Sequence, residues 1–175
     1  MKAQRFVPVI ALITLLAGYS LLESREGTAP SVSLNLDQNT ARLTSETIAG
    51  SEHSIAALVY KFEDQSILKS LEGALKRGIK VRLLADEKEA SDKKSLVFRA
   101  NRAGAEVRLW SREQGKLHAK CLIVDGQQVL SGSFNWTDSA AESNIELILS
   151  FENSETVQEF SALFERLWGK GIPLR

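Results

Sequence analysis

The sequence is poor in residues that build disulfides and metal centres, with one cysteine, Cys121, and two histidines, His53 and His118. A lone cysteine excludes an intramolecular disulfide and a cysteine-based zinc cluster. A multi-histidine metal centre cannot be assembled from two histidines, and the spacing of the carboxylates shows no metal-binding cluster. We therefore expect a functional site that works without a metal or another cofactor.

The chain also lacks an excess of charge of either sign, because 22 Lys and Arg residues balance 22 Asp and Glu residues. A surface coated with basic side chains for tight nucleic-acid binding is therefore not expected. A local positive flank leads up to residue 120, formed by Arg99, Arg102, Arg108, Arg112, Lys116 and Lys120. This flank suits a polyanion such as nucleic acid or an anionic lipid. A solvated helix and loop surface is the equally open alternative.

Long apolar runs are scarce, and the most prominent one covers residues 6–22, after Lys2 and Arg5. A basic start, an apolar middle and small residues near its end are typical of a secretory signal peptide. The run is at the short end of what crosses a bilayer, so an uncleaved membrane anchor is the alternative. We expect residues 1–26 to be a signal peptide or an N-terminal anchor, residues 27–31 a linker, and residues 32–175 the functional domain. The protein is then expected to be exported, as a periplasmic or secreted protein, or to be tethered to a membrane by its N-terminus.

Within that domain, hydrophobic periodicity predicts alternating strands and helices. Strands are expected at residues 31–36, 55–62, 79–85, 105–110 and 144–151. Helices are expected at residues 38–50, from Asp64 to Gly78, from Ser91 or Asp92 to Gly104, and after Asn153. The strand and helix alternation between residues 55 and 110 predicts parallel crossovers, and a later hairpin adds antiparallel pairs. The fold class is therefore α/β, a mixed β-sheet with helices on both faces.

The residues that carry chemistry are concentrated between positions 118 and 146. His118 and Lys120 are two positions apart, so on a strand their side chains leave the same face. Ala119, Cys121 and Ile123 then point into a core, which makes Cys121 a small core residue rather than a nucleophile.

A hairpin is predicted after this strand, because Asp125-Gly126 lies between two apolar runs. The second run ends in Ser131-Gly132-Ser133-Phe134-Asn135. Gly132 would let the backbone turn sharply beside a ligand, while the serine and asparagine side chains supply hydrogen-bond donors. An imidazole, an ammonium group and an amide that converge on one spot suit a tetrahedral anion such as a phosphate.

The spacing of these residues resembles the HKD signature of the phospholipase D superfamily. The pattern is His118-x-Lys120-x4-Asp125-x6-Gly132-Ser133-x-Asn135, followed by Trp136-Thr137 and Asn144-x-Glu146. It is similar both to small bacterial endonucleases of that superfamily and to the mitochondrial cardiolipin hydrolase and piRNA nuclease group. The resemblance implies an α/β/α sandwich and a phosphodiesterase.

The resemblance also implies roles for individual residues. His118 would attack phosphorus and form a phosphohistidine, while Lys120 and Asn135 would hold the non-bridging oxygens, assisted by Lys116. The imidazole would be oriented by Ser133 and Glu146. Two further motif residues, Asp125 and Gly132, would be structural.

One catalytic group is missing from a single chain, because the leaving group needs a second imidazole. No second H-x-K exists, and His53 has unsuitable neighbours. We therefore expect a homodimer in which two His118 side chains share one active site. The substrate is expected to be DNA or RNA, cut with little sequence preference. An anionic phospholipid such as cardiolipin, with membrane association through residues 6–22, is the alternative, and a catalytically idle phosphate-binding module is a third reading.

Overall fold

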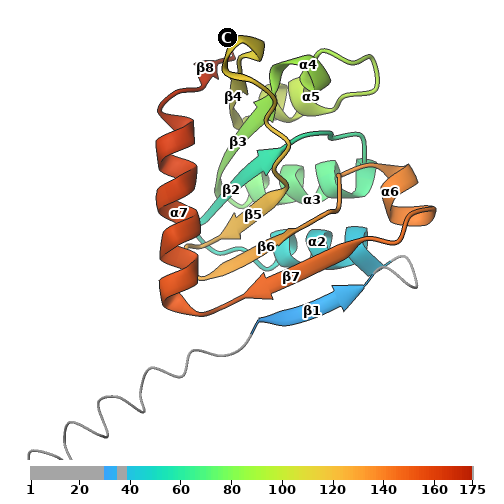
Figure 1. The fold of residues 1–175 in the computed structure, drawn as a ribbon, viewed down its shortest axis with the longest axis vertical. Coiled ribbons are helices and arrows are strands. Elements are labelled where there is room, and N and C mark those ends of the chain that lie inside the picture. Colours follow the sequence, from blue (N-terminus) through green and yellow to red (C-terminus); the bar gives the residue numbers. More distant parts are fainter. Residues whose placement is uncertain (1–29, 35–38, 175) are drawn as a thin grey trace, which may run out of the picture.

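The structure is a computed structural model that describes residues 30–34 and 39–174. Within these residues, one sheet of eight strands has the order β1-β7-β6-β5-β2-β3-β4-β8 (Figure 1). The strands are β1 (Ser31–Leu34), β2 (Ser54–Val59), β3 (Lys80–Asp86), β4 (Glu106–Trp110), β5 (Cys121–Val124), β6 (Gln128–Gly132), β7 (Leu147–Phe151) and β8 (Ile172–Pro173). The helices are α2 (Asn39–Ala49), α3 (Gln65–Lys76), α4 (Glu87–Ala90), α5 (Val97–Arg102), α6 (Asp138–Glu142) and α7 (Ser154–Trp168), with a 3₁₀ turn at Arg112–Gln114.

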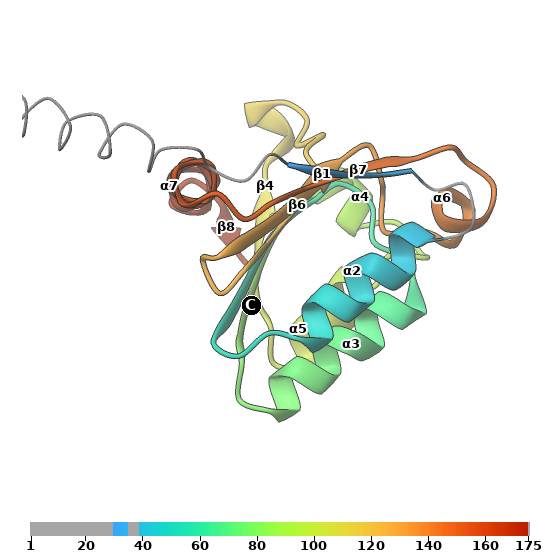
Figure 2. The same ribbon diagram turned by 90° about the horizontal axis from the view of Figure 1, so that it is seen from below.

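The sheet is mixed, as the element order predicts. Strands β2, β3 and β4 are parallel neighbours joined by helical crossovers, whereas β5, β6, β7, β1 and β8 pair antiparallel with their neighbours. Helix α7 lies on one face of the sheet, and α2, α3 and α5 lie on the other (Figure 2). The expected α/β class, with helices on both faces, is confirmed.

Two hydrophobic clusters hold these layers together. The larger cluster packs α2, α3 and α5 onto the sheet and includes Ile67, Leu71 and Leu83. The smaller cluster lies under α7 and includes Phe164 and Trp168. The long helices start where their capping residues predict, since Asp64 accepts from the amides of α3 and Asn153 from those of α7.

Several boundaries differ from the expectation. The helix expected from Ser91 or Asp92 begins only at Val97, and it is preceded by a separate short helix, α4, which Asp86 caps just after β3. Strand β2 ends at Val59, and Phe62 makes only an isolated bridge to Trp136. Helix α6 and strand β8 were not anticipated.

The N-terminal expectations fall largely outside the described residues. The signal peptide or anchor at residues 1–26 lies outside them entirely. The first expected strand is present as β1, which pairs with β7 and begins in the last residue of the expected linker. No helix within residues 30–34 and 39–174 is long and apolar enough to cross a bilayer.

Candidate active site

The hairpin β5–β6 carries the motif, and its turn has the predicted geometry. Asp125 and Gly126 have φ angles of 56° and 63°, and the Gln127 amide donates to the Val124 carbonyl at 2.9 Å. Positive φ at both central residues matches the right-handed twist of the flanking strands. The turn therefore fixes the register in which Cys121 pairs with Ser131 at the other end of the hairpin.

His118 and Lys120 lie in the segment before β5, and the expectation that they occupy a strand is wrong. Pairing with β2 stops at Leu58 and Cys121, so the preceding residues have no ladder partner. That segment is held instead by the Leu117 amide, which donates to the Asp86 carboxylate at 3.0 Å. His118 is exposed and Lys120 half-buried, so both side chains remain available to a ligand.

The inward-facing residues behave as the sequence predicts. Ala119, Cys121 and Ile123 pack in the cluster under α7. Burial raises the pKa of the Cys121 thiol to about 12, so the sulfur stays protonated at neutral pH and is a poor nucleophile.

The ammonium group of Lys120 occupies a defined position beside His118. Its Nζ donates to the His118 carbonyl at 2.9 Å and lies 4.9 Å from the centroid of the Tyr60 ring. The Lys116 Nζ lies 5.4 Å from the same centroid, and the His118 ring centroid is 4.5 Å away. One imidazole and two cations therefore gather around Tyr60.

This environment shifts two titrations. The pKa of His118 is lowered by partial burial and by the charges of Lys120 and Lys116, with Asp86 and Glu89 acting in the opposite direction. Burial also lowers the pKa of Lys120, which the Glu146 charge opposes and the Lys116 charge reinforces. A lowered pKa keeps more of the His118 imidazole neutral, the form that can act as a nucleophile.

Ser133 and Glu146 form a second polar group at the site. The Ser133 hydroxyl donates to Glu146 Oε2 and accepts from the Leu147 amide at 3.1 Å, while the Asn144 side chain donates to Glu146 Oε1 at 3.0 Å. Glu146 is 6% exposed. Within the described part of the chain, neither Ser133 nor Glu146 is hydrogen-bonded to the His118 imidazole. The structure therefore joins these two residues to each other rather than to His118 of the same chain.

Asn135 lies in the loop that follows β6. Its Oδ1 is buried and accepts no hydrogen bond from any described residue. The loop itself is fixed, because the Trp136 ring packs edge-on against Phe62 at 5.2 Å and the Trp136 carbonyl accepts from the Glu63 and Asp64 amides. Leaving a buried amide oxygen without a hydrogen bond destabilises the fold. An unpaired oxygen of this kind is typical of a group that binds a ligand.

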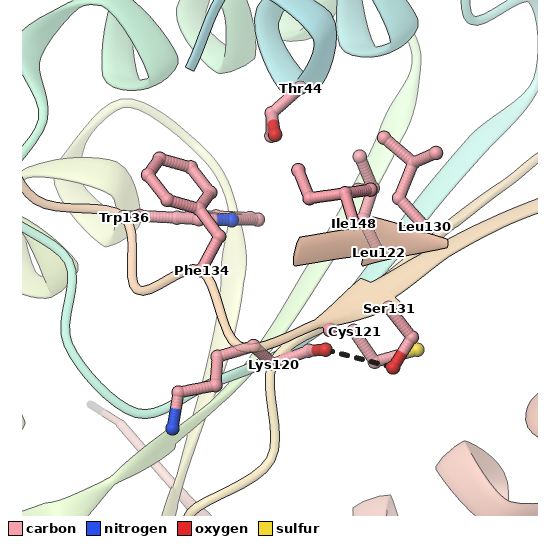
Figure 3. Close-up of a pocket in the computed structure, with 10 residues that line it drawn as sticks. Thr44, Lys120, Cys121, Leu122, Leu130, Ser131, Phe134, Trp136 and Ile148 are labelled. Carbon is pink, nitrogen blue, oxygen red and sulfur yellow. Dashed lines mark hydrogen bonds between the residues drawn. The ribbon is translucent and has the colours of Figure 1, made fainter. Parts of the chain in front are cut away.

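A small cavity lies behind the motif, between the hairpin, the loop of Trp136 and helix α2 (Figure 3). Its volume is about 20 Å³, which accommodates about one water molecule. The Lys120 side chain extends away from it, while the Lys120 carbonyl accepts from the Ser131 hydroxyl at 3.1 Å (Figure 3). The cavity is too small for a phosphodiester, so a substrate would lie on the open side where His118 is exposed.

Asp125 has no contact with the groups around His118. Its carboxylate accepts from the backbone amides of Ser54, His53 and Glu52 at 2.7, 2.8 and 2.9 Å. Partial burial raises the pKa of Asp125, but these three amides outweigh it and the net pKa is lowered. The bonds support the structural role that the sequence predicts.

The structure gives a different physical reason for the glycine at position 132 from the sharp turn that was expected. A side chain there would overlap the carbonyl group of Leu147 on the neighbouring strand, and Gly132 does not have a positive φ. The glycine therefore allows the close approach of β6 and β7, rather than a sharp turn beside a ligand.

The positive flank is not a single surface. Arg108 turns toward α7, donating to the Trp168 carbonyl at 2.7 Å with its guanidinium 4.7 Å from the centroid of that indole ring. Arg99 donates to Gln65 at 3.1 Å. Of the six basic residues, only Lys116 and Lys120 contact Tyr60.

Sequence reasoning missed Tyr60, Asp86 and Glu89. All three follow or end strands β2 and β3, whose carboxyl ends lie at the same edge of the parallel part of the sheet. Polar residues at that edge commonly form binding sites in α/β folds, so strand position was the signal that could have revealed them.

Comparison with known sequences agrees with the motif. A protein-family profile described as "Cardiolipin synthase, PLD-like domain" matches residues 44–168. Mitochondrial cardiolipin hydrolase of Xenopus laevis is 33% identical over 126 residues, which make up 72% of this chain and 60% of that protein. Phospholipase D of Rickettsia conorii is 33% identical over 109 residues, 62% of this chain and 54% of that protein. The chain thus spans a little over half the length of these two relatives.

Two solved structures match this chain over nearly their whole length. Nuc from Salmonella typhimurium, a phospholipase D family member, has a TM-score of 0.75 at 29% identity, covering 84% of this chain and 99% of that one. NucT from Helicobacter pylori has a TM-score of 0.76 at 22% identity, covering 83% of this chain and 99% of that one, which supports the fold alone. Together with the HKD spacing, these matches show that the chain belongs to the PLD-like domain family of the phospholipase D superfamily.

Proposed function

We propose that this protein is a metal-independent phosphodiesterase that acts through a phosphohistidine intermediate, most naturally as a low-specificity endonuclease on DNA or RNA. The observation that carries the proposal is the grouping of an exposed His118 with the Lys120 ammonium, both with lowered pKa values. A neutral imidazole beside a cation can attack an anionic phosphodiester, whose charge otherwise repels nucleophiles.

The reaction has two displacements. An imidazole nitrogen of His118 forms a bond to phosphorus as the bond to the leaving oxygen breaks, and that oxygen takes a proton from a second imidazole. The second imidazole then removes a proton from water, whose oxygen displaces His118 from phosphorus. Lys120 and Asn135 would bind the non-bridging oxygens, which gain charge in both transition states.

The second imidazole would come from a second copy of the chain in a twofold dimer. His53 is unsuitable, because its backbone amide is bonded to Asp125 at the opposite end of the hairpin from His118. The dimer also offers a partner for Glu146, which is not hydrogen-bonded to His118 within the described chain. Across the twofold axis, Glu146 of one copy would orient the imidazole of the other.

Nucleic acid is favoured by a basic groove beside the site. Its volume is about 660 Å³, and Lys93, Lys94 and Arg99 line it together with Glu63 and Asp138. Asp138 is three residues after Asn135, and the Glu63 amide donates to Trp136, so the groove adjoins the loop that carries Asn135. An open groove with three cations and two carboxylates has a net positive charge, which suits the phosphate backbone of a nucleic acid.

A phospholipid such as cardiolipin is the second candidate, and Ile145 favours it. This isoleucine is 79% exposed and directly precedes Glu146, so an apolar side chain stands at the rim of the site. The curated relatives that match include mitochondrial cardiolipin hydrolase. An exported or membrane-tethered location, set by residues 1–26, is part of the proposal for either substrate.

Plasmid nicking in excess EDTA tests the function, with the full chain and its His118→Ala variant compared. Nicking by the wild type alone is expected. Nicking by both proteins would contradict the assignment of the nucleophile, and nicking by neither would redirect the substrate to phospholipid.

Cardiolipin vesicles provide the second arm. If phospholipid is the substrate, Ile145→Ser lowers hydrolysis of the vesicles. If nucleic acid is the substrate, Lys93→Gln combined with Lys94→Gln lowers nicking and weakens its dependence on salt, while Ile145→Ser leaves nicking unchanged.

A further inference from the structure

One aromatic residue of the site, Tyr60, lies outside the motif. Tyr60 directly follows β2, is half-buried and belongs to neither hydrophobic cluster. Its ring centroid is 4.5 Å from that of His118, with an interplanar angle of 66°. Such an edge-on contact is favourable and restricts rotation of the imidazole, which is otherwise exposed.

The same ring also holds two cations. The Lys120 and Lys116 ammonium groups lie 4.9 and 5.4 Å from its centroid, within the range of a cation–π attraction. Two like charges near one imidazole repel each other and lower its basicity. The electron-rich ring offsets that repulsion in the absence of a substrate.

Tyr60 is itself anchored by helix α4. Its hydroxyl donates to Glu89 Oε1 at 3.1 Å, and Glu89 Oε2 forms an ion pair with Lys61 at 3.5 Å. Asp86, which caps α4, also accepts the Leu117 amide and so fixes the segment that leads to His118. The short helix therefore fixes both the ring and the backbone of the nucleophile.

We propose that Tyr60 is a positioning residue, whose ring holds the His118 imidazole and the Lys116 and Lys120 ammonium groups in the arrangement that receives a phosphodiester. The inference rests on the proposed phosphodiesterase function. The ring touches the nucleophile and the cations rather than the reacting phosphorus, so it acts through them.

The physical reason is preorganisation. An imidazole nitrogen must meet phosphorus along the line of the breaking bond, and a small misplacement costs about 10²-fold in rate. Without the ring, the exposed imidazole samples more rotamers and Lys120 loses its support, so fewer encounters have all groups in place. The effect should fall on kcat more than on KM, because many weaker contacts still bind the substrate.

Three full-length variants separate the ring from its hydroxyl and from general effects of losing an aromatic side chain. Tyr60→Leu removes the ring, Tyr60→Phe retains it without the bond to Glu89, and Phe98→Leu makes the matched change at an exposed position of α5. With bis-p-nitrophenyl phosphate as substrate, we expect kcat to fall about 10²-fold for Tyr60→Leu. Tyr60→Phe should restore most of the rate, and Phe98→Leu should equal the wild type.

NMR titration of the imidazoles is the readout that a merely structural role would not move. The chain has two histidines, so a His53→Gln background assigns the His118 signal. The charged groups that act on His118 are Lys120, Lys116, Asp86 and Glu89. Loss of the ring exposes the imidazole and releases Lys120, so the pKa of His118 should rise in Tyr60→Leu but stay close to the wild-type value in Tyr60→Phe.

The outcomes are distinct. A folded Tyr60→Leu variant with wild-type turnover and an unchanged His118 titration would overturn the positioning role. A Tyr60→Phe variant as slow as Tyr60→Leu would transfer that role to the hydroxyl and Glu89, and so overturn the role of the ring. If the wild type hydrolyses no phosphodiester while the His118 titration still shifts in Tyr60→Leu alone, the proposed function fails and the ring's hold on His118 is supported.

Discussion

The two ends of the β5–β6 hairpin are built in opposite ways. At the turn, the Asp125 carboxylate accepts hydrogen bonds from three consecutive backbone amides, those of Glu52, His53 and Ser54, at the start of β2. At the open end, Lys120 and Lys116 approach the same aromatic ring and repel each other. The buried Oδ1 of Asn135 accepts no hydrogen bond from any described residue.

This difference separates stability from function within one motif. Polar groups that are fully hydrogen-bonded inside the fold stabilise it. Neighbouring like charges and an amide without a hydrogen-bond partner reduce stability until a ligand binds to them. A tetrahedral anion would meet the cations at the open end, and the turn offers no such place. The contrast supports a framework role for the aspartate of the motif, and it supports the proposal that the histidine and the lysine act in catalysis.

The largest effect on turnover is expected when the proposed nucleophile at the open end, His118, is removed. His118→Ala should lower turnover by roughly 10⁶-fold, the scale found when a catalytic nucleophile is removed. Its free energy of unfolding should fall by no more than about 1.5 kcal/mol, because the side chain is exposed and loses only its edge-on contact with Tyr60. Steady-state kinetics and urea unfolding of the same preparation provide the check. A turnover number within about tenfold of the wild-type value would contradict the mechanism.

The second-largest effect on turnover is expected when the Lys120 cation is removed and His118 is retained. Lys120→Ala should lower kcat by about 10²–10³-fold, as when a donor that stabilises an oxyanion is lost. Single-turnover rates at saturating substrate measure this directly. A change confined to KM would mean that Lys120 binds the ground state and the transition state equally.

At the turn, the expected effect is on stability. Asp125→Ala should lower the free energy of unfolding by about 2 kcal/mol, since three backbone amides lose a charged acceptor. Urea unfolding at neutral pH measures this loss, and the kcat of the remaining folded protein should equal that of the wild type. Loss of turnover without loss of stability would place Asp125 in the chemistry.

The same carboxylate gives the stability a pH dependence. Its folded-state pKa is lowered, so its contribution is complete above the unfolded value of about 3.9 and is lost as the pH falls through the folded value. The difference in stability between wild type and Asp125→Ala should therefore shrink on acidification below about pH 4. A constant difference down to pH ~2 would contradict this linkage.

Most of the fold could be predicted from local pattern, because its signals are local. Asp64 and Asn153 cap helices with their own side chains, and Asp125-Gly126 adopts the turn that its residue types favour. The errors occur where tertiary contacts decide. His118 and Lys120 alternate like strand residues, yet they lie outside the ladder because Asp86 holds Leu117.

The site was predictable only in part for the same reason. Residue types and spacing identified His118 and Lys120, but Tyr60 and Glu89 reach the site from the ends of other strands. Gly132 illustrates this limit of local sequence patterns. A glycine is required there because Leu147 approaches closely, and Leu147 belongs to a paired strand more than a dozen residues away in the sequence. No local pattern contains that contact.

The smallest expected effect tests the like charge at the open end. Lys116→Gln removes one of the charges that lower the pKa of His118, so that pKa should rise. In a shared site, a neutral His118 attacks and the partner's His118 must be protonated, so both limbs of the kcat/KM profile move to higher pH. Arg102→Gln, the same charge change at an exposed position of α5, should leave the profile in place. Movement of one limb alone would show that the proton donor is a group other than the partner's His118.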